Sequence, residues 1–140
     1  LEQARLQGQS VSVVATNAVK LAGYTNAAWA VMTCDSLVRN HQTAQELGVL
    51  AAPGLVEMQR GQPPTIANGA FGGDALSVAH TIPFAVAPEL DNVIANLELL
   101  PAKVKSAKGD QVGPRQYELA RKFHAAGLLA TERMNELLAK

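Results

Sequence analysis

The sequence predicts a mainly α-helical fold, a bundle of four to five helices forming a single domain over residues 1–140. Three observations predict it. Hydrophobic residues, many of them alanine, make up 48% of the chain, no long stretch alternates cleanly as a half-buried strand would, and three segments place a proline where a helix would begin. These segments are "AAPGLVEM", "VAPELDNVI" and "VGPRQYELA". A Gly/Pro-rich loop at about 61–74 and a possible short extended segment at about 78–87 interrupt the helices.

The first half of the chain contains the longest helical stretch. Ser10 is suited to cap a helix that begins at Val11, and Gly23 weakens it locally, so we expect one long helix or two in line. A further amphipathic helix follows, started by Asp35 or Ser36 and ended by Gly48 in a left-handed conformation.

Residues 11–34 are long enough to cross a membrane and carry a single charge, Lys20. However, Asn17, Lys20 and Asn26 lie in the middle of this segment, where polar groups are costly in lipid. A helix packed among other helices is therefore the better interpretation, and a membrane partner is not expected.

The segment "PPTIANGAFGGDA" (residues 63–75) is the richest in glycine and proline. It lacks the lysine of a phosphate-binding loop and no predicted strand precedes it, so we interpret it as a structural connection. Asp74 is expected to cap a short helix over 75–80, followed by extended chain. Alternatively, residues 77–87 run extended, with Pro83 tolerated at an edge. Phe71 either anchors a neighbouring subunit or packs into its own core.

The second proline-initiated segment predicts a helix that places Leu90, Val93, Ile94, Leu97 and Leu100 on one face. Pro101 is expected to stop or bend this helix.

The last helix is predicted to run from Pro114 to the end of the chain. Its apolar residues are spaced by three and four positions, which indicates a heptad seam packed along its whole length. Outside the seam, Glu118 and Lys122 are placed to form a favourable i,i+4 pair. The seam residues and Phe71 are the candidate interface residues: Phe71, Phe123, Gly127, Ala130, Met134 and Leu137.

Charge and cysteine content restrict the partners. Twelve basic and twelve acidic residues give a net charge of zero, so no nucleic-acid partner is expected. The nearest basic run, with Lys103, Lys105 and Lys108, is interpreted as a solvated face. The single cysteine, Cys34, excludes internal disulfides and is typical of a reducing compartment such as the cytoplasm. Because the chain does not begin with methionine, we expect a processed chain or a piece of a longer product.

No catalytic motif stands out. His41, His80 and His124 are widely separated, Cys34 and His41 lie about two helical turns apart, and no serine lies in a nucleophile turn. We therefore expect no catalytic residue, metal or cofactor.

Low charge, zero net charge and the seam favour a structural or assembly subunit that homo-oligomerises through Ala/Gly-lined helix faces. The alternatives are a small enzyme or ligand-binding domain, with a pocket formed by Trp29, Cys34, the 68–74 loop and one histidine, and an accessory subunit of a larger complex.

Overall fold

The computed structural model describes residues 1–139, and over these residues the predicted four-to-five-helix bundle is wrong. Seven α-helices, two short 3-10 helices and one antiparallel pair of strands form a mixed fold instead. In chain order the elements are α1 (Glu2–Leu6), α2 (Val11–Leu21), α3 (Ala27–Glu46), α4 (Gly54–Gln59), β1 (Leu76–His80), η1 (Pro88–Leu90), η2 (Ile94–Asn96), β2 (Leu97–Pro101), α5 (Ala102–Lys108), α6 (Pro114–Ala125) and α7 (Thr131–Leu138).

The N-terminal hairpin, which we define as α2 and α3 (residues 11–46), follows local capping signals. Ser10 Oγ accepts a hydrogen bond from the Val13 amide at 3.5 Å, which confirms Ser10 as the first cap. Asn26 caps α3 by accepting from the Trp29 amide at 3.0 Å. The expected fresh start at Asp35 or Ser36 is wrong because α3 continues through both, whereas the predicted end at Gly48 is confirmed by its positive φ of 73°.

The two strands replace helices that the sequence predicted. In their antiparallel register Leu76 faces Pro101 and His80 faces Leu97, so the predicted helices over 75–80 and 88–100 are wrong. Over residues 77–80, β1 agrees instead with the extended alternative. The side chain of Asn96 supplies the physical reason. It accepts from the Ile82 amide at 2.8 Å and donates to the Ile82 carbonyl at 3.0 Å, as a neighbouring strand would. These long-range bonds hold the segment extended and override its helical periodicity.

Asp74 caps a helix, but a different one from the helix predicted. Its carboxylate accepts from the Lys103 amide at 3.0 Å, in the first turn of α5, and from the adjacent Ala75 amide at 2.9 Å. The negative charge therefore lies at the positive end of α5, where it is electrostatically favourable. This contact ties the end of the glycine-rich loop to the helix that follows β2.

Gly127 divides the predicted C-terminal helix into α6 and α7. Its φ of 79° is left-handed, and two backbone bonds close the end of α6: Gly127 N to His124 O at 3.0 Å and Leu128 N to Phe123 O at 2.8 Å. This is the Schellman arrangement, for which glycine is the favoured residue. A continuous heptad seam is therefore wrong; the chain turns, and α7 packs back against α6.

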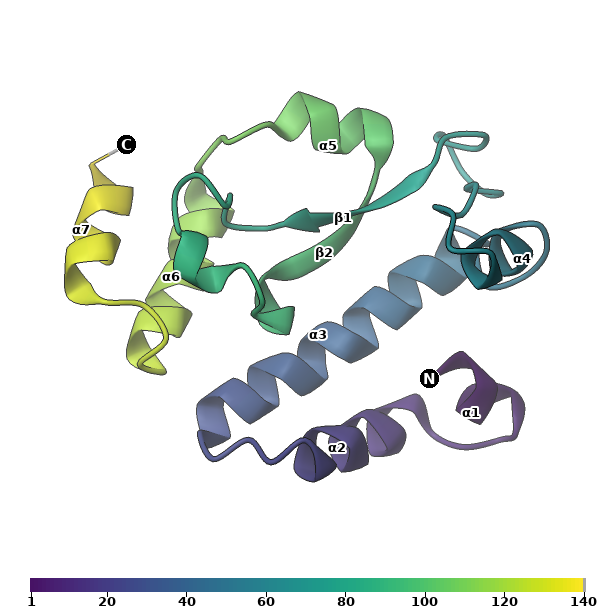
Figure 1. The fold of residues 1–140 in the computed structure, drawn as a ribbon, viewed down its shortest axis with the longest axis horizontal. Helices are drawn as coiled ribbons and strands as arrows, with labels where there is room; N and C mark the ends of the chain where they lie inside the picture. The colour runs from purple at the N-terminus through teal and green to yellow at the C-terminus, as the bar shows by residue number, and fades with distance from the viewer. Residues whose placement is uncertain (140) are drawn as a thin grey trace.

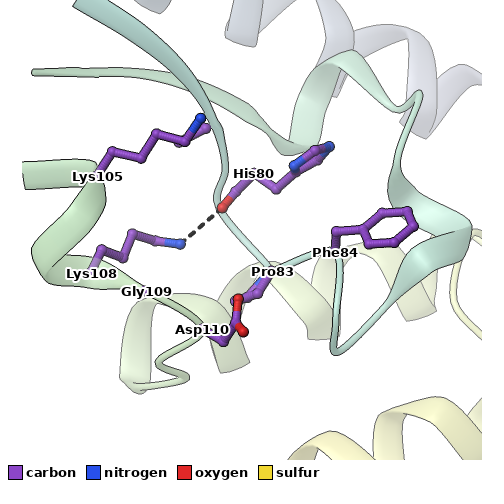
Figure 2. A pocket seen from close by; sticks show the side chains of 8 residues that line it. His80, Pro83, Phe84, Lys105, Lys108, Gly109 and Asp110 are labelled. Carbon is purple, nitrogen blue, oxygen red and sulfur yellow. Dashed lines mark hydrogen bonds between the residues drawn. The ribbon is translucent and has the colours of Figure 1, made fainter. Parts of the chain in front are cut away.

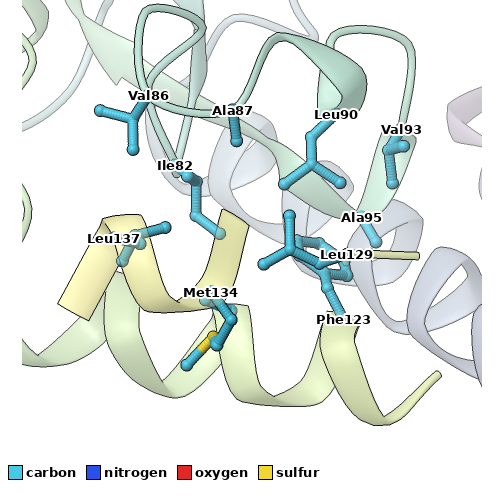
Figure 3. Packing of buried hydrophobic residues seen from close by; sticks show 11 residues of the cluster. Ile82, Val86, Ala87, Leu90, Val93, Ala95, Phe123, Leu129, Met134 and Leu137 are labelled. Atoms are coloured by element: carbon cyan, nitrogen blue, oxygen red, sulfur yellow. The ribbon is translucent and has the colours of Figure 1, made fainter. Parts of the chain in front are cut away.

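Two clusters of buried residues form the core. The larger lies between α6, α7 and the segment around η1 and η2, as Figure 3 shows. Its members are Ile82, Val86, Ala87, Leu90, Val93, Ala95, Ala120, Phe123, Leu129, Met134 and Leu137. The smaller joins the end of α3 to the glycine-rich loop and β1 through Ala44, Val49, Ile66 and Leu76.

Helix α3 lies between α2 on one side and the η2–β2 segment on the other (Figure 1). Its contact with η2 and β2 uses polar side chains: Ser36 Oγ donates to the Ile94 carbonyl at 3.1 Å, and Asn40 Nδ2 donates to the Leu97 carbonyl at 3.1 Å. Helix α5 covers the strands from another side, and α4 and the glycine-rich loop lie near the C-terminal end of α3. No helix of residues 1–139 is long and apolar enough to cross a membrane.

Candidate functional site

The six predicted interface residues do not share one surface. Phe123 and Leu137 are completely buried and Met134 nearly so, all within the larger core cluster of this chain. Gly127 and Ala130 are exposed, in the turn between α6 and α7 and at the start of α7. The buried members of the seam therefore hold α6 and α7 to the rest of the chain, and their side chains are not available to a partner.

Phe71 lies at the tip of a closed loop and is 38% exposed, outside both core clusters. Below it, Ile66 N bonds to Asp74 O and Gly73 N bonds to Ile66 O, each at 2.8 Å. Ile66 itself is buried in the smaller core cluster. The base of the loop is thus fixed by the backbone and by Ile66, while Phe71 stays at the surface.

The residues of the alternative pocket are not brought together. The 68–74 loop follows the C-terminal end of α3, where Asn68 donates to the Glu46 carbonyl at 3.2 Å. Cys34 lies twelve positions before Glu46 on the same helix, which at the rise of an α-helix is roughly 18 Å along the axis. Trp29 is farther still and packs edge-on against Tyr24, with ring centroids 5.0 Å apart.

Each histidine has its own local partner. His41 Nε2 lies 3.2 Å from a Glu2 carboxylate oxygen, His80 Nε2 lies 2.9 Å from Asp91 Oδ1, and His124 Nε2 lies 3.1 Å from Thr131 Oγ1. Within residues 1–139 no three His, Cys, Asp or Glu side chains are grouped so that they could hold a metal ion.

One surface pocket of about 230 Å³, the His80 pocket, lies between β1 and α5. Figure 2 shows Lys105 and Lys108 extending from α5 toward the segment that carries His80. Lys105 Nζ donates to the Val78 carbonyl and Lys108 Nζ to the His80 carbonyl, both at 2.9 Å. Burial lowers the pKa of Lys108 below its ordinary value, and Glu98 opposes this shift.

These lysine bonds protect the open edge of the sheet. The backbone groups of residues 76, 78 and 80 face away from β2, since the Leu76 amide bonds to Pro64 instead of a β2 residue. Unpaired carbonyls on such an edge invite pairing with another chain, and lysines are a common means of preventing it. Lys105 and Lys108, two of the three lysines interpreted as a solvated face, therefore bind α5 to β1. The principal polar groups of the His80 pocket already have partners within the chain.

A second pocket, of about 310 Å³, lies between α3, β2 and α6, and we call it the Arg39 pocket. Six of the residues that line it carry polar or charged side chains: Arg39, Thr81, Glu98, Arg115, Glu118 and Lys122. Within residues 1–139, only the side chains of Glu98 and Arg115 among these six are paired, through two hydrogen bonds of 2.7 and 3.1 Å. The predicted pair of Glu118 and Lys122 does not form an ion pair here. The sequence gives no sign that these residues converge, because each lies on an element whose neighbours are set by the tertiary fold.

Comparisons of this chain with known protein families, with curated proteins and with solved structures found no match.

The third surface feature is an apolar groove of about 480 Å³ between α2 and α3, which we call the hairpin groove. Val19, Ala27, Ala30, Val31 and Cys34 supply its apolar lining. Lys20 and Asp35 also line this groove, and both are exposed. The thiol of Cys34 lies 3.5 Å from Thr16 Oγ1, so it contacts the opposite helix rather than a histidine.

Proposed function

We propose that this protein is a structural subunit that self-associates through the hairpin groove. The observation that carries the proposal is the poor burial of α2. Seven of its eleven residues are apolar, but only Ala15 and Val19 are buried. A helix with so much apolar surface normally covers it against another element.

The most exposed large hydrophobic side chains also lie in the N-terminal part of the chain. Leu6, Val13, Leu21 and Val31 are 71%, 57%, 89% and 60% exposed, respectively, and Val31 lines the groove. Single exposed apolar residues are common, whereas exposed apolar side chains on a helix pair that carries an apolar groove are typical of an interaction surface. The alanines of the groove also permit a second helix to approach closely.

The charges at the groove favour a second copy of this chain as the partner. Lys20 and Asp35 have opposite signs, and neither side chain forms an ion pair or hydrogen bond within residues 1–139. In a two-fold interface each residue of one protomer meets the complementary residue of the other. Lys20 of one copy would then pair with Asp35 of the other, and the reverse, around a shared apolar centre. The zero net charge of the chain removes the repulsion that would oppose this contact.

Sedimentation velocity at rising protein concentration tests the proposal, with Val31→Glu as the disrupting variant. Val31 is exposed, so the fold tolerates the change, but a carboxylate in the apolar centre would weaken association by about tenfold or more. Leu138→Glu is the matched control, because Leu138 is 49% exposed on α7, outside the groove. A wild-type chain that stays monomeric throughout the micromolar range contradicts the proposal, as does equal weakening by both variants.

A further inference from the structure

The Arg39 pocket combines a fixed ion pair with charged groups that have no partner. Its floor is formed by Glu98, which is 8% exposed and accepts from both terminal nitrogens of Arg115. These hydrogen bonds raise the pKa of Arg115 above its ordinary value, so its guanidinium stays charged. Each terminal nitrogen of Arg115 keeps a second N–H that is not bonded to Glu98.

Two further cations line the same pocket from different helices. Arg39 on α3 and Lys122 on α6 are exposed, and neither side chain has an ion-pair or hydrogen-bond partner within residues 1–139. Glu118 is the one carboxylate of the pocket that is not already paired. Three cations thus share the pocket with two carboxylates, one of which is fully engaged by Arg115. Like charges held around one pocket repel unless an anion lies between them.

Thr81 places a hydroxyl at the same pocket. The residue is only 6% exposed, and within residues 1–139 its hydroxyl has no hydrogen-bond partner, but solvent reaches the hydroxyl oxygen. The hydroxyl can therefore bond a ligand oxygen in place of water.

We propose that the Arg39 pocket binds a small organic oxyanion, a carboxylate or a phosphate ester, through Arg39, Arg115, Lys122 and the Thr81 hydroxyl. Guanidinium groups match the planar geometry of both oxyanions, and an ammonium adds a point charge. The pocket volume of about 310 Å³ lies at the small end of ligand sites, which suits a metabolite rather than a polymer. The carboxylate of Glu118 repels a bound anion and therefore weakens the binding of more highly charged anions most.

The test is an NMR titration of the whole chain at low salt with inorganic phosphate, succinate and the neutral succinamide. We expect saturable shifts of the Thr81 and Glu98 amides with at least one of the two anions and none with succinamide. Which anion binds more tightly distinguishes a phosphate site from a carboxylate site. No saturation by either anion at about 10 mM overturns the proposal, since that is too weak for a ligand site.

Matched variants separate this pocket from general surface charge. Arg39→Gln and Lys122→Gln should each weaken binding about tenfold or more. Arg121→Gln removes the same charge from an exposed neighbour of Lys122 that does not line the pocket, and it should change binding less than about twofold. Equal losses in all three variants would show diffuse attraction and overturn the site.

Two more variants test the other polar groups of the pocket. Glu118→Gln should tighten anion binding, because it removes the repelling carboxylate. Thr81→Val should weaken binding, because it removes a donor to the ligand, and should change the melting temperature little, because the hydroxyl has no hydrogen-bond partner within residues 1–139. If Thr81→Val lowers the melting temperature and leaves binding intact, the hydroxyl is structural and its assignment to the ligand fails.

Discussion

The N-terminal hairpin and the C-terminal core cluster use their apolar residues in opposite ways. Helix α2 buries only Ala15 and Val19 and leaves Val13 and Leu21 in solvent. The C-terminal cluster buries eleven residues drawn from the segment between β1 and η1, from η1 to η2, and from α6 to α7 (Figure 3). Since buried apolar area is the main source of folding free energy, the cluster stabilises the fold and the hairpin contributes much less.

The contact between the two regions is polar, unlike the apolar packing inside the cluster. The inner face of α3 meets η2 and β2 through Ser36 and Asn40, whose hydroxyl and amide groups donate to the backbone carbonyls of Ile94 and Leu97. Each such bond contributes only about 1 kcal/mol net, although it is directional. The hairpin is therefore well positioned but weakly buried, which suits a surface that awaits a partner.

The largest effect is expected for Phe123→Ala. Phe123 is completely buried in the cluster, and its removal leaves a cavity that costs about 3–5 kcal/mol of unfolding free energy. Leu21→Ala, at a residue 89% exposed on α2, should change it by less than about 0.5 kcal/mol. Chemical denaturation, at a protein concentration where the chain is monomeric, measures the unfolding free energy of both variants. Similar losses for the two would contradict the division into a stabilising core and an exposed hairpin.

Local signals in the sequence predicted local structure well. Ser10, Pro114 and Gly48 mark helix ends as expected, because caps and helix-start prolines act within one turn of the chain. The failures come from partners far away in sequence. The side chain of Asn96 bonds to the backbone of Ile82, and Asp74 caps α5 instead of the residues that follow it. No local sequence pattern identifies either partner.

The heptad spacing of the C-terminal segment correctly predicted which residues are buried, but it wrongly predicted one continuous helix. Phe123, Met134 and Leu137 are buried as their spacing predicts, but Gly127 ends the helix between them. Glycine at a seam position is compatible with close packing and with a helix end, and spacing alone does not separate the two. The Arg39 pocket could not be predicted because its residues are far apart in sequence. Arg39 and Arg115 come to line one pocket only through the tertiary fold.

An intermediate effect is expected at Asn26, where the two regions are joined. Its side chain caps α3 and also donates to the Ala126 carbonyl at 2.6 Å, at the end of α6. Asn26→Ala should lower the unfolding free energy by about 1–2 kcal/mol, the sum of a lost cap and a lost long-range bond. Asn17→Ala, at an exposed position of α2, is the control.

Hydrogen exchange shows where the loss at Asn26 falls. The amides of α2 and α3 should exchange faster while those of α6 keep most of their protection, because the hairpin opens as a unit of lower stability. Equal acceleration in α2, α3 and α6 would instead show that the two regions unfold only together. The hairpin and the C-terminal cluster would then differ in exposure but not in stability.

The smallest effect concerns α1, which joins the hairpin through charge. Glu2 accepts from Arg5 at 2.6 Å and lies 3.2 Å from His41 on α3. The hydrogen bond from Arg5, and to a lesser degree the contact with His41, lowers the pKa of Glu2 below its ordinary 4.5. A lowered pKa in the folded state means that the contact stabilises above pH 4.5 and is lost as the pH falls through the lowered value.

Acid should therefore release α1 from α3 before it affects the core cluster. The loss is at most about 1 kcal/mol, as for other ion pairs near a surface, so it appears in the NMR shifts of the α1 amides rather than in global unfolding. Glu2→Gln should abolish the acid-induced change, whereas Glu132→Gln, at an exposed residue of α7, should leave it intact. If the α1 shifts of Glu2→Gln still move below pH 4.5, another group holds α1. The contact of Glu2 with His41 would then be incidental to the attachment of α1.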